Sequence, residues 1–185
     1  GLAQAMYGQT LGRFDANTRT NFNRSFPSKA ADELTGRPAA ERLKATLLAI
    51  AEQADVVLDL HCDDEGPVYL YVSERQIEEG RRLARAMQAT VILTDSSDDP
   101  ISFDLAVGAI WAAQNRDQYA RFAATAELRG MMDVTPELAA QDAEGLYRYL
   151  IDIGTVNDEL PSVSPLEPIV GDVDAAQLIP TPVPG

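Results

Sequence analysis

Short apolar segments alternate with amphipathic ones along most of this 185-residue chain, and this alternation restricts the possible folds most strongly. Residues 55–61, DVVLDLH, form a nearly continuous apolar run, which is typical of a strand covered on both faces. Similar runs predict further strands at 68–72, 90–95 and 122–128. We therefore expect an α/β fold, with a mixed sheet and helices on both of its faces.

The first predicted helix spans residues 38–54, PAAERLKATLLAIAEQA. Its spacing favours an inward face made of Leu43, Leu47, Ile50, Ala51 and Ala54, with the charged residues Glu41, Arg42, Lys44 and Glu52 turned elsewhere. This pattern indicates a helix that lies on a core.

Three more helices are predicted downstream. Ser73 and Gln76 form an S-x-x-Q pattern, which predicts a capping box that starts a helix with Ile77, Ala84 and Met87 facing inward. A second helix holds Leu105, Ile110 and Trp111. Thr135 and Pro136 are typical of the start of a third, which has inward-facing Leu138, Leu146, Tyr149 and Leu150 and which Gly154 closes.

The composition changes from residue 155 onward. Six of the eleven prolines fall between Pro161 and Pro184, and this part contains no lysine or arginine. We expect residues 1–154 to form the α/β domain and residues 155–185 to be a proline-rich linker or arm.

The formal net charge of −14 disfavours nucleic acids and anionic membrane surfaces as partners, so an anionic substrate would need a local basic pocket. No apolar run approaches the length of a membrane span, and the first ten residues do not resemble a leader peptide. The single cysteine, Cys62, excludes an internal disulfide and fits a reducing compartment. A cytoplasmic location is the expectation.

The chain has one histidine, His61, at the end of the first predicted strand. Ligands gather at the carboxyl ends of strands in open α/β sheets, so His61 is a candidate metal ligand that Asp59 could orient. A structural histidine at a strand end is the alternative. Cys62 points to the opposite face and is expected to be a small buried side chain, whereas Asp63, Asp64 and Glu65 are expected to form a solvated turn.

Residues 20–28, TNFNRSFPS, surround Arg24 with two asparagines, two phenylalanines and a proline. Asn23 and Arg24 together offer an amide and a planar set of donors, which suits the binding of a carboxylate. An ordinary loop with an exposed arginine and two anchoring aromatic residues is the alternative.

Three ordered motifs, NFNRSFP, DLH and TAELRG, resemble the succinylglutamate desuccinylase/aspartoacylase family, relatives of the zinc carboxypeptidases. The resemblance covers roughly residues 1–154. It implies a zinc carboxypeptidase-like fold and a zinc-dependent deacylase that cleaves N-acyl amino acids or similar small amides. It also implies that His61 binds zinc, that Asn23 and Arg24 bind the substrate carboxylate, and that Glu127 is the catalytic carboxylate.

The setting of Glu127 agrees with this role, because a carboxylate within the small and apolar strand FAATAEL is costly to bury without a partner or a task. A structural ion pair with Arg129 is the alternative. Arg13, in LGRFD, is a further candidate for binding an anionic substrate.

The sequence departs from the family pattern at two places. Asn21 stands where the family segment begins with aspartate, and the family's upstream H-x-x-E motif, which supplies two zinc ligands, is missing. Because a catalytic zinc usually takes three protein ligands, we expect a catalytic domain truncated at its start. The proline-rich end resembles a connector toward a C-terminal β-rich domain, which is expected to be missing as well. Negligible activity and weak zinc affinity are expected for the isolated chain, and tight stoichiometric binding in a zinc titration would contradict this.

Two other functions fit the same residues. In a non-catalytic α/β anion-binding module, Arg24 would hold an anion and His61 would be structural. In a zinc carboxypeptidase, the substrate would be a peptide. An upstream H-x-x-E motif would favour a hydrolase over the anion-binding module.

Overall fold

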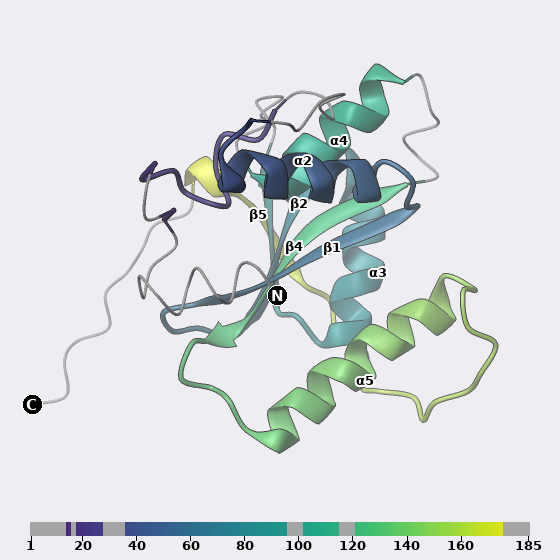
Figure 1. Cartoon of the computed structure of the whole chain (residues 1–185). Coiled ribbons are helices and arrows are strands. Elements are labelled where there is room, and N and C mark those ends of the chain that lie inside the picture. Colours follow the sequence, from purple (N-terminus) through teal and green to yellow (C-terminus); the bar gives the residue numbers. More distant parts are fainter. Residues whose placement is uncertain (1–13, 16–17, 28–35, 96–101, 115–120, 176–185) are drawn as a thin grey trace, which may run out of the picture. The chain divides into compact units, whose positions relative to one another are not determined.

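The structure is a computed structural model of the whole chain, and it describes residues 14–15, 18–27, 36–95, 102–114 and 121–175 (Figure 1). The chain divides into two compact units: unit 1 comprises residues 1–59 and 97–124, and unit 2 comprises residues 60–96 and 125–185. Unit 1 contains helices α2 (Ala39–Ala51) and α4 (Phe103–Ala113). Unit 2 contains helices α3 (Ile77–Met87) and α5 (Pro136–Asp152).

Five strands form one sheet in the order β1-β4-β2-β3-β5. Their bounds are Val56–Asp63 for β1, Val68–Ser73 for β2, Val91–Asp95 for β3, Phe122–Gly130 for β4 and Ile169–Asp172 for β5. Strand β3 pairs in parallel with both β2 and β5. Residues 64–67 are too short a connection for a parallel crossover, so β2 runs opposite to β1 and the sheet is mixed. The predicted α/β fold is confirmed.

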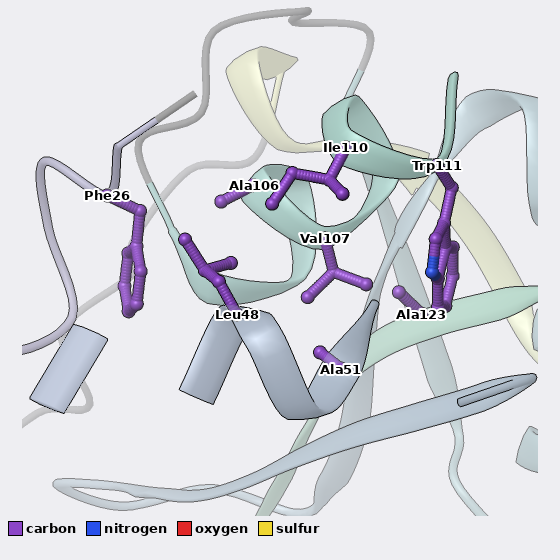
Figure 2. Packing of buried hydrophobic residues seen from close by; sticks show 8 residues of the cluster. All are labelled: Phe26, Leu48, Ala51, Ala106, Val107, Ile110, Trp111 and Ala123. Atoms are coloured by element: carbon purple, nitrogen blue, oxygen red, sulfur yellow. The ribbon is translucent and has the colours of Figure 1, made fainter. Parts of the chain in front are cut away.

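The hydrophobic core of unit 1 lies between α2 and α4. Figure 2 shows Leu48 and Ala51 of α2 facing Val107 and Trp111 of α4. Phe26 joins this cluster from the loop that follows Arg24, and Ala123 joins it from β4. Since Trp111 and Leu48 are almost fully buried, this cluster is the packing that fixes the Arg24 loop to unit 1.

Helix α2 does not present the face that the sequence predicts. Leu47 and Ile50 are exposed, whereas Lys44 is only 3% exposed. The prediction was therefore wrong for these three residues. Lys44 is held on the core side because it donates a hydrogen bond to the carbonyl of Arg24.

Unit 2 is layered, with α3 packed against β2 and β3 on one side and against α5 on the other (Figure 1). Both contacts are close. A Cβ added at Gly80 would lie 3.0 Å from the Val72 Cγ2 atom, and one added at Gly145 would lie 3.0 Å from the Met87 Cα atom. Glycine at these two positions lets α3 approach both neighbours.

The ends of the helices agree with the sequence at α5 and differ at α3. The Thr135 hydroxyl accepts a hydrogen bond from the Leu138 N–H group, and Gly154 has the left-handed φ of +76° that a closing glycine adopts. The capping box at Ser73 is wrong, because a 3-10 turn (Glu74–Gln76) separates it from α3 and the Ser73 side chain makes no capping bond. Leu150, expected to face inward, is exposed.

Part of the proline-rich segment belongs to the sheet. Strand β5 pairs with β3, and the Ile169 N–H group donates to the Thr90 carbonyl at 3.0 Å. Glu167, just before β5, forms an ion pair with Arg85 of α3. The sequence pattern predicts no strand here, since four residues among prolines carry little periodic signal. The division of the chain at residue 154 stays a prediction.

No helix within the described residues is long and apolar enough to cross a membrane.

Candidate functional site

His61 and Glu127 face each other in unit 2, from the neighbouring strands β1 and β4. The distance from His61 Nδ1 to Glu127 Oε1 is 3.7 Å, and the two side chains are 27% and 11% exposed. A carboxylate this shielded is destabilised relative to water unless a polar or charged neighbour compensates it. The imidazole of His61 is one polar neighbour that the structure brings to Glu127.

Arg129 does not take the role of counter-ion to Glu127 that we considered as the alternative. Its guanidinium forms a bidentate pair with Asp142 of α5, at 2.7 and 2.9 Å. This pairing raises the pKa of Arg129, and the carboxylates that contribute are those of Asp142 and Asp133. The Arg129 guanidinium therefore stabilises the contact between β4 and α5.

The backbone of β4 is irregular just after Glu127. The Phe122 N–H group donates to the Asp55 carbonyl at one end of β1, and the Met131 N–H group donates to the Asp63 carbonyl at the other. These bonds show that β1 and β4 are parallel. The residue numbers of donor and acceptor differ by 67 at the first bond and by 68 at the second. Between these bonds β4 therefore contains one residue more than β1, which is a β-bulge. Arg129, with a left-handed φ of +73°, marks its position.

A second polar contact crosses β4 next to this pair. The Tyr69 hydroxyl on β2 donates to Asp63 Oδ2 on β1 at 2.9 Å, and β4 lies between these two strands in the sheet. Burial raises the pKa of the Tyr69 phenol, and hydrogen bonds with Tyr71 and Asp63 and the nearby Glu127 carboxylate act in the same direction. Tyr69 therefore stays a neutral donor that ties β1 to β2 beside Glu127.

The residues after His61 were only partly predicted. Asp64 and Glu65 are exposed, as expected of a solvated turn. Asp63 is instead bound on both oxygens, since its Oδ1 atom accepts from the Asp64 N–H group and its Oδ2 atom accepts from Tyr69. Cys62 is exposed, so the prediction of a buried thiol was wrong. The reason is that β1 lies at the edge of the sheet.

Asn23 and Arg24 lie in unit 1, in a loop anchored at both ends. The Phe103 N–H group at the start of α4 donates to Asn23 Oδ1 at 3.2 Å. Phe26 is 7% exposed within the core, and its ring is 5.4 Å from that of Phe103. The Arg24 side chain is exposed, and its Nη1 group donates to the Asn23 carbonyl at 2.7 Å. The loop therefore presents a guanidinium on a fixed backbone, as a carboxylate site requires.

A buried carboxyl group lies at the start of α4. Asp104 is 7% exposed, and its Oδ1 atom accepts a 2.5 Å hydrogen bond from the Ser102 hydroxyl. Burial raises the pKa of Asp104, the Ser102 hydroxyl opposes this shift, and the Asp59 carboxylate reinforces it. Asp59 of the DLH motif is thus electrostatically coupled to Asp104 in unit 1.

Of the other predicted site residues, Arg13 lies outside the described residues. Lys44, Tyr69 and Asp104 were not predicted as part of a site. Tyr69 alone had a signal, because Tyr69 and Tyr71 alternate with valine and leucine in VYLYV and so share one face of the strand. Lys44 and Asp104 gave none, since each sits in an ordinary helical pattern.

The metal-binding capacity of the described residues is small. They include no group of three or more histidine, cysteine, aspartate or glutamate side chains that could hold a metal ion. A catalytic zinc usually has three protein ligands and an open position for water. His61 fits as one such ligand, but the described residues do not by themselves complete a zinc site.

Comparison with known families assigns the chain. The model of the succinylglutamate desuccinylase/aspartoacylase catalytic domain matches residues 3–153. The chain therefore belongs to the succinylglutamate desuccinylase/aspartoacylase family, whose members are zinc-dependent hydrolases of carbon–nitrogen bonds. A search of curated proteins finds no match.

Solved structures share the fold. A protein assigned to this family from Shewanella frigidimarina is 24% identical with a TM-score of 0.72, and the match covers 89% of this chain and 54% of that one. The product-bound ectoine utilization protein EutE (DoeB) from Ruegeria pomeroyi is 15% identical with a TM-score of 0.64, covering 92% and 50%. A succinylglutamate desuccinylase from Silicibacter sp. TM1040 is 17% identical with a TM-score of 0.64, covering 94% and 50%. The chain thus spans about half the length of these structures.

Proposed function

We propose that this protein is a zinc-dependent deacylase that hydrolyses the amide bond of N-acyl amino acids or similar small amides. Membership of the family supports the reaction class. The observation that carries the proposal is the pair formed by His61 and Glu127, a shielded carboxylate 3.7 Å from an imidazole on the neighbouring strand. Such groups cluster at functional sites, because burying them has a cost that a purely structural position avoids.

Glu127 is proposed as the general base and acid. Its carboxylate takes a proton from the attacking water as the new carbon–oxygen bond forms, and then delivers it to the amide nitrogen as the carbon–nitrogen bond breaks. The products are a carboxylic acid and an amine. The shielded position of Glu127 favours this role, because water around a carboxylate competes for the proton that it must hold.

His61 is proposed as one zinc ligand. When bound, zinc supplies a Lewis acid for the amide carbonyl and lowers the pKa of a bound water. Since the described residues hold no cluster of three ligands, the remaining ligands are proposed to come from outside them.

Arg24 and Asn23 are proposed to bind the carboxylate of the substrate. The Arg24 guanidinium is exposed on an anchored loop, and the carbonyl of Asn23 fixes one of its nitrogens. The remaining guanidinium donors suit a carboxylate, and the amide of Asn23 adds a further donor. In a chain with a net charge of −14, such a local cation is needed to hold an anionic substrate.

The test is hydrolysis of a panel of N-acyl amino acids by the full-length protein, with E127Q as the variant. Loss of a general base typically costs about 10²- to 10⁴-fold, so turnover by E127Q falls by that factor while its zinc content is unchanged. E78Q is the matched control, because it removes the same charge from a side chain that is 89% exposed in α3, and it keeps the original rate.

Equal turnover by E127Q and the unaltered protein would remove Glu127 from the mechanism. A full-length protein that binds carboxylates at Arg24 and hydrolyses nothing in the panel would support the anion-binding module instead.

A further inference from the structure

Lys44 is buried on a helix whose hydrophobic pattern would place it in solvent. It is 3% exposed, although burial of an ammonium group is strongly unfavourable unless the group is paired and hydrogen-bonded. On the same helix, Leu47 is 38% and Ile50 is 63% exposed. Helix α2 thus buries a charge and leaves two large apolar side chains in water, which burial of apolar surface alone would not produce.

The contacts of Lys44 lead to the Arg24 loop. Its Nζ atom donates to the Arg24 carbonyl at 2.5 Å and lies 5.4 Å from the centre of the Phe26 ring. Burial lowers the pKa of the ammonium group, and Glu41 opposes this shift. Among the described residues no carboxylate forms an ion pair with Lys44, so the loop provides its compensation through a backbone dipole and a ring face.

The loop is bent at the point where Lys44 holds it. Ser25 follows Arg24 with a left-handed φ of +58°, a conformation that non-glycine residues rarely adopt without support. On the other side of Arg24, Asn23 Oδ1 accepts a hydrogen bond from Phe103. Arg24 therefore lies between two anchors, one from α4 and one from α2, and only the anchor from α2 carries a charge.

We propose that Lys44 is a positioning residue for Arg24: its ammonium group holds the Arg24 carbonyl, and its positive charge favours an anion at the Arg24 loop. This role rests on the proposed function of Arg24 and extends it to a residue that does not touch the substrate. Charge and geometry act together, because a fixed carbonyl orients the arginine and a nearby shielded cation strengthens the attraction of an anion.

The test uses the full-length protein labelled with ¹⁵N-arginine, with the backbone and Nε signals of Arg24 identified by their loss in R24K. Acetate is the carboxylate probe, and its dissociation constant is read from the Arg24 signals. K44M replaces the ammonium with an apolar chain of similar length, and K44R keeps both the charge and the donor. R42M is the matched control, because it removes a positive charge from an exposed position of α2.

The expected result has three parts. K44M moves the Arg24 signals of the free protein and weakens acetate binding about tenfold, equivalent to about 1.4 kcal/mol. K44R restores both to within about twofold. R42M changes neither. The proposal is overturned if K44M leaves the Arg24 signals and the acetate affinity equal to those of R42M, even when K44M lowers the melting temperature, because Lys44 would then be merely structural.

Two further outcomes separate this proposal from the function proposed above. If the unaltered protein shows no acetate-dependent change at Arg24 and K44M still moves its signals, the positioning role stands and the carboxylate role of Arg24 is wrong. If K44M does not fold, K44Q is compared with K44R: tighter acetate binding by K44R supports the proposal, and equal binding overturns it.

Discussion

The Arg24 loop of unit 1 and the pair formed by His61 and Glu127 in unit 2 hold their charged groups in different ways. The loop is held by its own buried residue Phe26 and, from outside, by Lys44 and the start of α4. The pair sits on two neighbouring strands of the sheet, and its surroundings are fixed by cross-strand and strand-to-helix bonds.

Both arrangements depend on contacts between distant parts of the sequence, but they are specified differently. The alternation of a strand fixes the face to which His61 or Glu127 points, and the pairing of β1 with β4 then brings the two residues together. A loop has no such rule. The orientation of Arg24 depends on Lys44, which lies twenty residues away, and on a helix start that is eighty residues away.

Removal of the Phe26 ring gives the largest expected effect. F26A leaves a cavity in the core of unit 1, and the free energy of unfolding falls by about 3–5 kcal/mol in chemical denaturation. Because Phe26 anchors the loop, the NMR signals of Arg24 change, whereas the single imidazole signal, that of His61, keeps its position. M132A is the control, since Met132 is 86% exposed and its truncation has little effect. A His61 signal that moves as far as those of Arg24 would show that Phe26 supports both groups.

Removal of the Arg129 guanidinium tests the support of the pair in unit 2. R129M leaves Asp142 without its bidentate partner, and stability falls by about 2–3 kcal/mol, below the roughly 3–5 kcal/mol of a fully buried pair because both side chains keep some contact with water. R85M breaks the more exposed pair with Glu167, and a loss below about 1 kcal/mol is expected from it. Equal losses from the two variants would mean that shielding does not distinguish these pairs.

Removal of one hydroxyl tests the bond that crosses β4. Y69F takes the donor from Asp63 and lowers stability by about 1–2 kcal/mol in chemical denaturation at pH 7. Y147F removes the same kind of bond, between Tyr147 and Asp158, at an exposed position, and its effect is expected to be near zero.

The same variant has a signature at high pH. The folded-state pKa of Tyr69 is raised, so its contribution is complete below the ordinary tyrosine value of 10.0 and is lost as the pH rises above it. The stability difference between the unaltered protein and Y69F therefore shrinks in alkaline solution. A difference that stays constant with pH would show that the phenol titrates as freely as in an unfolded chain.

The smallest expected effect is in unit 1. Burial raises the pKa of Asp104, so the ionised carboxyl is disfavoured in the folded protein at neutral pH. D104N keeps an acceptor for Ser102 and raises the melting temperature at pH 7. This gain fades as the pH falls through the folded-state pKa of Asp104 and is gone below its ordinary value of 3.8. A gain that is the same at acid and neutral pH would assign it to packing instead.

These contrasts show how far the sequence alone could lead. The four strands were predicted from short apolar runs, and the helices from helical spacing of apolar residues and from their end signals. The DLH and TAELRG motifs predicted His61 and Glu127 as site residues, and the two side chains lie close together. Their roles stay predictions. The inward position of Lys44 could not be predicted, since its partner is a backbone carbonyl, which any residue at position 24 would offer.

Two other features escaped prediction for different reasons. Strand β5 has four residues, and its pairing with β3 rather than its own pattern makes it a strand. The left-handed backbone of Arg129 could not be predicted, because glycine and asparagine usually adopt that conformation and arginine rarely does.

Gly80 and Gly145 set the thickness of unit 2. At Gly80 of α3 an added Cβ would meet the branched Val72 side chain of β2, and at Gly145 of α5 it would meet the backbone of Ala86 and Met87 in α3. An alanine at either position would require its neighbour to move by a few tenths of an ångström. The spacing of the three layers is therefore set by two glycines that lie in different helices.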